Sequence, residues 1–306
     1  MWIGVDGGGT KTQFVLFDDE MRARQSFRLG TCHPGQVGYD GMAAVIGEGV
    51  GLARAAADGT VEGIGLGLAG YGQDPAIRAR MADAVRQAVG DTPFELVSDV
   101  EAAWASTLDL ADGVVVICGT GSIAFGRAGD KTTRAGGWGY QVGDEGSGYW
   151  IGREVLRLFS RQADGRDPRG PLFDVVMREL GLAESYEIIT YARDVLAGDR
   201  TRTASLTRVL RQAADAGDPV AHAAYGRVAR ELADIIGAVA ARLFAPGASA
   251  PVGYVGGVFE GAGAYLLEPL AQALPAGCTL AHPAHEPAAG PCLLLRRRLA
   301  QGGAAC

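Results

Sequence analysis

The first residues that could do chemistry stand between two apolar runs near the start of the chain, in the segment Asp6-Gly7-Gly8-Gly9-Thr10-Lys11-Thr12. The apolar runs at 2–5 and 13–17 predict two strands, so the segment between them is predicted to be a hairpin turn. Glycines let backbone N–H groups approach an anion closely, and a carboxylate at a strand end suits a phosphate-bound Mg²⁺ held through water. An ordinary tight hairpin is the alternative interpretation.

Two further glycine clusters follow apolar runs later in the chain, namely Gly119-Thr120-Gly121-Ser122 and Gly256-Gly257. Open α/β sheets bind ligands beyond the carboxyl ends of their strands. The hairpins at 6–10 and 119–122, if they face each other across a cleft, could therefore wrap a polyphosphate with backbone donors. The sequence contains neither a GxxxxGK[ST] loop nor a GxGxxG fingerprint between a strand and a helix. A nucleotide site in this chain must therefore be of the hairpin type.

A second carboxylate, Asp99, follows the predicted strand 94–97 and precedes a predicted helix. Phosphoryl transfer to an alcohol needs a group that orients and deprotonates the hydroxyl, and a carboxylate has this role in kinases. The alternative is that Asp99 only caps the helix that follows it.

A glycine-rich segment at 136–150 combines carboxylates with aromatic rings, including Trp138, Asp144 and Glu145. A carboxylate beside an aromatic plane is typical of sugar sites, where the carboxylate binds hydroxyl groups and the aromatic side chain contacts the ring face. Trp138 could instead be a core aromatic under a loop. The four histidines show no metal-ligand spacing, and only His33, in the loop 31–35, is kept as a candidate site residue.

The elements that must position these residues form two similar series. The first is predicted as strands 2–8, 12–18 and 22–29, helix 38–57, strand 63–70, helix 75–89, strand 94–97 and helix 100–110. The second is predicted as strands 114–118, 123–126 and 130–135, helices at 147–161 and over most of 171–243, strand 252–258, helix 263–273, strand 279–280 and helix 288–300. This order predicts mixed sheets carrying helices, and the two series suggest an internal duplication of the fold.

Composition narrows the class of protein. A chain of 306 residues that is 48% hydrophobic is long enough for two domains with substantial cores. The formal net charge of −7 argues against a nucleic-acid or anionic-membrane partner. Five cysteines without CxxC spacing indicate reduced thiols, and we find neither a secretion signal nor a transmembrane run, so the protein is expected to be cytoplasmic.

Taken together and in this order, the motifs resemble the N-acetylglucosamine kinase branch of the sugar kinase/Hsp70/actin superfamily, which is grouped with the BadF/BadG-type ATPases. The resemblance implies an α/β fold of two actin-like (ribonuclease H-like) domains, each a mixed sheet with helices, and ATP in the cleft between them. It implies a first domain at 1–115 joined by the C-terminal helix 288–303, and a second domain at 116–287 with a helical insertion at 150–245. It also implies Mg²⁺, phosphorylation of a hexosamine on its 6-hydroxyl, and a homodimer.

The resemblance assigns roles by motif position. Asp6 would bind Mg²⁺, and Asp99 would be the catalytic residue. The residues implied in ATP binding are Gly8, Gly9, Thr10, Lys11, Gly119, Thr120, Gly121, Ser122, Gly256 and Gly257. The residues implied in sugar binding are Cys32, His33, Gly70, Asp99, Thr120, Gly121, Gly137, Trp138 and Asp144.

Two departures from the family pattern affect the expected substrate. Animal members have an Asn where this chain has Cys32-His33, and a Ser near Ala69, and both positions touch the sugar. N-acetylglucosamine is the expected substrate, and free glucosamine is the alternative. An ATPase activator of the BadF type is a second alternative, but its iron–sulfur cluster needs a cysteine loop that neither Cys118 nor Cys278 resembles.

Overall fold

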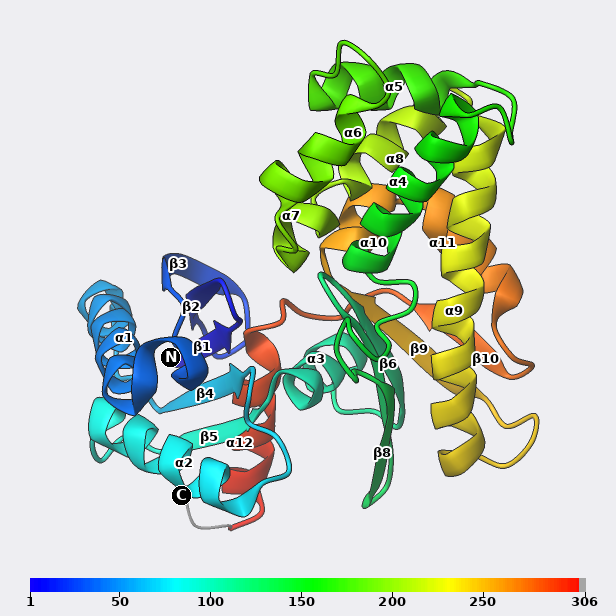
Figure 1. The fold of residues 1–306 in the computed structure, drawn as a ribbon. Helices are drawn as coiled ribbons and strands as arrows, with labels where there is room; N and C mark the ends of the chain where they lie inside the picture. The colour runs from blue at the N-terminus through cyan, green and yellow to red at the C-terminus, as the bar shows by residue number, and fades with distance from the viewer. Residues whose placement is uncertain (303–306) are drawn as a thin grey trace. The chain divides into compact units, whose positions relative to one another are not determined.

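The structure, a computed structural model, describes residues 1–302. It divides into two compact units, which are considered separately. Unit 1 comprises Met1–Asp112 and the segment from Ala281 onward, and unit 2 comprises Gly113–Leu280 (Figure 1).

Unit 1 contains one five-stranded mixed sheet with the order β3-β2-β1-β4-β5. Strands β1, β2 and β3 form an antiparallel meander, and β1, β4 and β5 run parallel. The strands are β1 (Trp2–Gly7), β2 (Lys11–Phe17), β3 (Ala23–Gly30), β4 (Gly63–Leu68) and β5 (Phe94–Ser98). The helices are α1 (Pro34–Ala56), α2 (Pro75–Val89), α3 (Asp99–Leu108) and α12 (Ala289–Ala300).

Side chains alternate across the unit 1 sheet, as a strand requires. Ile3 and Val5 of β1 point into a core that also contains residues of α1 and α2, whereas Trp2 packs with residues of α12. Helix α12 lies very close to the sheet, because a Cβ on Gly65 would stand 2.3 Å from the backbone N of Cys292. Glycine at this position therefore permits the close approach of the C-terminal helix to strands β1 and β4.

Unit 2 contains a second five-stranded sheet, with the order β10-β9-β6-β7-β8. Strands β6, β7 and β8 again form an antiparallel meander, and β6 is parallel to β9. The strands are β6 (Gly113–Cys118), β7 (Ser122–Ala128), β8 (Lys131–Gly136), β9 (Ala250–Val255) and β10 (Cys278–Ala281). In both units the first strand of the meander pairs with a later parallel strand, which supports the predicted duplication of the fold.

A run of helices separates β8 from β9 in the sequence, and two more lie between β9 and β10 (Figure 1). They are α4 (Gly148–Ala163), α5 (Pro171–Leu180), α6 (Glu187–Thr190), the π-helix η1 (Tyr191–Leu196), α7 (Arg200–Ala204), α8 (Thr207–Asp215), α9 (Pro219–Leu243), α10 (Gly257–Ala262) and α11 (Ala264–Ala273). Together with the sheet they enclose one core, to which Val116, Phe159 and Leu232 contribute fully or almost fully buried side chains.

The expectation of two mixed sheets with helices is confirmed, but several boundaries differ. Helix α1 begins at Pro34 and not at Gly38, because His33 caps it and Pro34 suits the first turn; Gly38, with φ of 72°, interrupts the helix with non-helical backbone. The expected strand 252–258 ends at Val255, and a short helix begins at Gly257. The expected C-terminal helix ends at Ala300, and residue 303 lies outside the described residues.

Candidate functional site

The hairpin between β1 and β2 presents backbone donors. The N–H of Gly8 closes the turn by donating to the carbonyl of Lys11 over 3.0 Å. Within residues 1–302, no hydrogen bond uses the N–H groups of Gly9 and Thr10, and both residues are exposed. The turn carbonyls are held by side chains, because Thr31 donates to Gly8 and Gln36 donates to Gly9. Two neighbouring N–H groups are therefore free to bind an anion.

The hairpin between β6 and β7 has the same arrangement in unit 2. The N–H of Gly119 donates to the carbonyl of Gly121 over 2.9 Å. The N–H groups of Thr120 and Gly121 again have no hydrogen-bond partner in the described part of the chain. The Ser122 hydroxyl is not directed to a ligand but donates to the carbonyl of Glu145 over 2.6 Å. The turn is fixed further by the N-terminus of α4, where Gly148 donates to the carbonyl of Gly119.

Two carboxylates lie at the carboxyl ends of unit 1 strands. Burial, together with the negative charge of Asp99, raises the pKa of Asp6 to about 6, and Lys11 lowers it only in part. Partial desolvation also raises the pKa of Asp99, against the opposing effects of the Val100 N–H and the nearby His33. The charge of Asp99 therefore contributes to the raised pKa of Asp6.

Asp99 is not the cap of helix α3. The hydroxyl of Ser98 accepts from the N–H of Glu101 at 3.3 Å and fills that role. One Asp99 oxygen accepts from the adjacent Val100 N–H at 3.0 Å, and the residue remains exposed. The start of the helix therefore does not depend on Asp99, and its second carboxylate oxygen is available to a ligand.

Two neighbouring residues of unit 1 that were predicted to bind the sugar differ in accessibility: the side chain of His33 is accessible, and that of Cys32 is buried. His33 accepts from the N–H of Gly35 through Nδ1, so its Nε2 carries the proton in the neutral ring, beside Gly70. A Cβ added to Gly70, whose φ is 85°, would stand 3.0 Å from this Nε2. Cys32 is only 2% exposed, its thiol lies against Gly7, and burial raises its pKa. The Cys32 thiol thus has almost no surface to offer a ligand.

The segment 136–147 forms the corresponding part of unit 2. Gly137 has φ of 68° and donates its N–H to the carbonyl of Ser122, which attaches this segment to the second hairpin. Trp138 is 67% exposed, so the interpretation as a core aromatic is wrong. Asp144 is 3% exposed, has a left-handed φ of 62°, and lies 3.6 Å from Nη2 of Arg200. No hydrogen bond to its carboxylate is found in residues 1–302.

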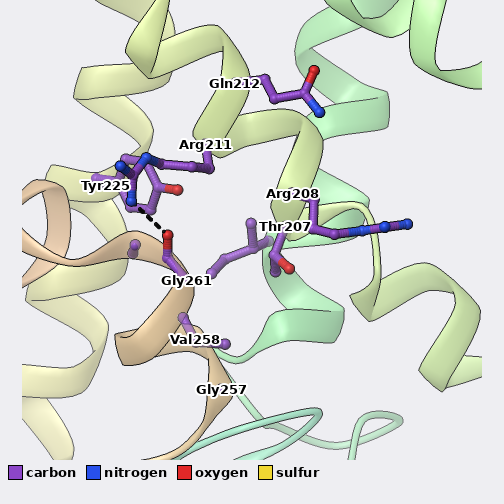
Figure 2. Close-up of a pocket in the computed structure, with 10 residues that line it drawn as sticks. Thr207, Arg208, Arg211, Gln212, Tyr225, Gly257, Val258 and Gly261 are labelled. Atoms are coloured by element: carbon purple, nitrogen blue, oxygen red, sulfur yellow. Dashed lines mark hydrogen bonds between the residues drawn. The ribbon is translucent and has the colours of Figure 1, made fainter.

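A cavity of about 340 Å³ lies in unit 2 beside the Gly256-Gly257 motif (Figure 2). Gly256 has φ of 117°, and a Cβ there would stand 2.3 Å from the carbonyl of Cys118, so only glycine fits. Helices α4, α8, α9 and α10 enclose the cavity with Ile151, Thr207, Arg208, Arg211, Gln212, Tyr225, Gly257, Val258, Gly261 and Ala262. In Figure 2, Arg211 donates to the carbonyl of Gly261, a bond of 2.8 Å.

The α8 side of this cavity could not be predicted from the sequence. Arg208, Arg211 and Gln212 have the i, i+3, i+4 spacing of one helix face, but a polar helix face is usually solvated, so this spacing does not indicate a binding site.

Among residues 1–302, no three His, Cys, Asp or Glu side chains lie together as a metal site. None of the helices in this part of the chain is long and apolar enough to cross a bilayer.

Comparisons with known proteins agree on one family. The model of the BadF/BadG/BcrA/BcrD ATPase family matches residues 3–294. An N-acetyl-D-glucosamine kinase of Dictyostelium discoideum is 31% identical over 259 residues, which are 79% of this chain and 80% of the relative. An N-acetylmuramic acid/N-acetylglucosamine kinase of Clostridium acetobutylicum is 31% identical over 237 residues, 75% of this chain and 76% of the relative.

A solved structure is similar to this chain over nearly its whole length. A Chromobacterium violaceum protein assigned as an N-acetylglucosamine kinase is 26% identical, with a TM-score of 0.69, and the match covers 96% of this chain and 98% of that protein.

Proposed function

This chain belongs to the BadF/BadG/BcrA/BcrD ATPase family, and we propose that it transfers the γ-phosphoryl group of ATP to the 6-hydroxyl of a hexosamine, with N-acetylglucosamine as the first candidate. The names of the relatives support the sugar class. The observation that carries the proposal is the matched pair of glycine hairpins, each of which presents two backbone N–H groups without a partner in the described chain. A polyphosphate is the ligand that such donors suit.

In this proposal the binding roles are assigned to each unit separately. The N–H groups of Gly9 and Thr10 in unit 1, and of Thr120 and Gly121 in unit 2, bind phosphate oxygens. The base and ribose enter the unit 2 cavity beside Gly256 and Gly257, where the absence of side chains permits close approach to the backbone.

Asp99 is the proposed general base. Its carboxylate accepts the proton of the sugar 6-hydroxyl as the oxygen bonds to the γ-phosphorus. At the same time the bond between the γ-phosphorus and the β–γ bridging oxygen breaks, and its electron pair leaves with ADP. The raised pKa of Asp99 makes it a stronger base than an ordinary aspartate at neutral pH.

The residues present fit a magnesium ion that arrives with the nucleotide. Mg²⁺ commonly binds through one or two carboxylates, substrate phosphates and several waters, so a three-residue cage is not needed. Asp6 is half-buried, and its carboxylate has no hydrogen bond or ion pair within residues 1–302. It would hold the ion, which neutralises phosphate charge when bound, and Lys11 lies near enough to lower the pKa of Asp6.

Each unit, taken by itself, offers candidate sugar ligands, which are His33 in unit 1 and the Gly137–Asp144 segment in unit 2. Asp144 can accept from sugar hydroxyls, Trp138 offers an exposed ring face, and Nε2 of His33 offers a donor beside Gly70. Cys32 would act indirectly, by fixing the backbone before His33. The side chain at 69 is a methyl group, without the hydroxyl of the family pattern, so glucosamine remains the alternative substrate.

A coupled assay of ADP release tests this function with Mg-ATP and four sugars: N-acetylglucosamine, glucosamine, glucose and N-acetylmannosamine. The proposal expects ADP release that depends on one hexosamine and is abolished by EDTA. Release that ignores every sugar would favour the ATPase-activator alternative. In that case anaerobically prepared protein should show the visible absorption of an iron–sulfur cluster.

The proposal also places the enzyme in the cytoplasm as a homodimer. Free thiols at Cys32, Cys118, Cys278 and Cys292 support a reducing compartment, since none of these residues is paired. Sedimentation equilibrium would measure the oligomeric state directly, and a single species at the monomer mass would exclude the dimer.

A further inference from the structure

We propose that Arg200 is a further residue of the transfer reaction, which exchanges its contact with Asp144 for the transferring phosphoryl group at the Gly119–Ser122 hairpin. This inference rests on the proposed function. It concerns a residue of the helical segment that no motif in the sequence singles out.

Arg200 stands between the two parts of the unit 2 site. Its Nη2 is 3.6 Å from Oδ2 of Asp144. The same nitrogen is 3.2 Å from the point where a Cβ on Gly121 would stand, so it lies directly against the hairpin with the free N–H groups. Its guanidinium also lies 5.6 Å from the centre of the Tyr140 ring. All four residues belong to unit 2.

The charge of the site calls for a cation at this position. The transferring phosphoryl group carries negative charge on three oxygens, and the hairpin offers it only neutral backbone donors. The chain has two lysines, and the one in unit 2, Lys131, lies opposite Ala128 in the sheet, at the end of β7 that is far from the hairpin. Arg200 is a basic side chain that does reach this hairpin, because its Nη2 is among the atoms nearest to the Cβ position of Gly121.

The contact between Arg200 and Asp144 is weak enough to be exchanged. At 3.6 Å it is longer than a hydrogen bond, and the Arg200 side chain is 43% exposed. Asp144 is nevertheless buried, with no hydrogen bond to its carboxylate in the described chain. Buried polar groups are normally hydrogen-bonded, so this carboxylate is prepared for a ligand. Once sugar hydroxyls donate to Asp144, the Arg200 guanidinium can bind an oxyanion without leaving a buried charge unpaired.

An unusual backbone holds Arg200 in place. The π-helix η1 precedes it, followed by Ala197 with φ of 48° and Gly198 with φ of 71°. Such helices are rare and often occur at functional sites. Helix α7 is then fixed against α4, because a Cβ on Gly152 would stand 2.0 Å from the carbonyl of Thr203. The backbone of Arg200 is therefore anchored, while its side chain is partly exposed.

The test compares Arg200→Ala and Arg200→Lys with the wild-type enzyme in the same assay. For Arg200→Ala we expect kcat to fall by roughly 10²-fold, as for loss of one oxyanion donor, with little change in the KM for sugar. Arg200→Lys should retain part of the activity, and added guanidinium chloride at low concentration should partly restore Arg200→Ala. Calorimetric binding should show a weaker affinity for a non-hydrolysable ATP analogue and an unchanged affinity for ADP.

Arg193→Ala is the matched control, because Arg193 is exposed on η1 and its recorded partner is the neighbouring Asp194. It removes the same charge and should leave kcat within about twofold, as for a surface substitution. Thermal unfolding of each variant separates loss of fold from loss of chemistry, and Arg200→Lys serves if the alanine variant does not fold.

Two results would overturn the inference while leaving the proposed function intact. One is an unchanged kcat in Arg200→Ala beside an active wild type. The other requires N-acetylmuramic acid as a fifth sugar in the assay: a loss of activity confined to that sugar would mean that Arg200 binds its carboxylate. A wild-type enzyme without sugar-dependent turnover would instead remove the proposed function itself.

Discussion

At the scale of single residues, the two carboxylates of unit 1 differ in environment and in proposed task. Asp6 is the more shielded and carries the pKa of about 6, whereas Asp99 is exposed at the start of α3. Both residues were identified from the sequence because each follows an apolar strand. The electrostatic effect of Asp99 on Asp6 could not be predicted, since it depends on how β1 and β5 are placed in the sheet.

Replacing Asp99 by Asn should lower kcat by roughly 10²- to 10⁴-fold, because the base that accepts the hydroxyl proton is lost. The affinity for nucleotide, measured by calorimetry, should change less than threefold. Glu101→Gln is the control, since it removes an acidic group from the same turn of α3. If Asp99→Asn keeps most of its turnover, Asp99 has only a structural role.

Replacing Asp6 by Asn should stabilise the fold and weaken the enzyme. The pKa of Asp6 is raised in the folded state from 3.8 to about 6, so folding takes up a proton between these values. Stability therefore falls as the pH rises through this window, and the penalty persists above it. At pH 7 the free energy of unfolding of the Asn variant, measured with urea, should be higher by on the order of 1 kcal/mol, a figure reduced for the partial exposure of Asp6. Its KM for Mg-ATP should rise.

Asp18→Asn should behave in the opposite way. Hydrogen bonds from Arg22 hold the pKa of Asp18 below its usual value. Its contribution to stability is present above the unfolded pKa and is lost as the pH falls through the folded one. A gain in stability in Asp18→Asn, or a loss in Asp6→Asn at pH 7, would contradict these assignments.

At the scale of elements, the strands and the hairpins followed from the alternation of apolar runs and glycine turns. The sequence did not reveal η1, because a π-helix depends on packing and not on a residue pattern. It also did not reveal that α8 lines the cavity beside Gly257, because polar residues on one helix face are usual at a surface. Short residue patterns predicted the glycine loops. Contacts between residues distant in the sequence determine η1 and the lining of the cavity, so these were not predicted.

Helix α12 gives a direct test of packing in unit 1. Gly65→Ala should lower the free energy of unfolding by about 1–3 kcal/mol, because the added methyl would meet the backbone of α12 at Cys292. Gly51→Ala, in an open position on α1, should instead stabilise by about 0.5–1 kcal/mol. Urea denaturation measures the free energy of unfolding of both variants. The same change in both would argue against the close approach of α12 to the sheet.

Filling the unit 2 cavity should block nucleotide without disturbing the fold. A Cβ on Gly261 meets no atom within 4 Å, so Gly261→Leu can place its side chain in open space beside Val258. The dissociation constant for ATP should rise at least about tenfold, because the leucine occupies volume that the base needs. Gly51→Leu is the size-matched control. An unchanged ATP affinity in Gly261→Leu would place the base elsewhere.

At the scale of the whole molecule, the predicted fold class and the family resemblance are both confirmed. The order of the glycine motifs along the chain carried this prediction, since each motif alone is common. The predicted domain limits and the individual binding roles stay predictions. They depend on how the two units and the ligands come together. Neither a residue pattern nor the structure of one unit gives that information.

Identification of the product tests the central claim most directly. The protein is incubated with Mg-ATP and N-acetylglucosamine, and the sugar is followed by proton–phosphorus correlation NMR. The account predicts a phosphate on the 6-oxygen, formed together with ADP and at least about 10²-fold more slowly with Asp99→Asn. Phosphate on another oxygen, or ADP formed at the same rate without sugar, would contradict it.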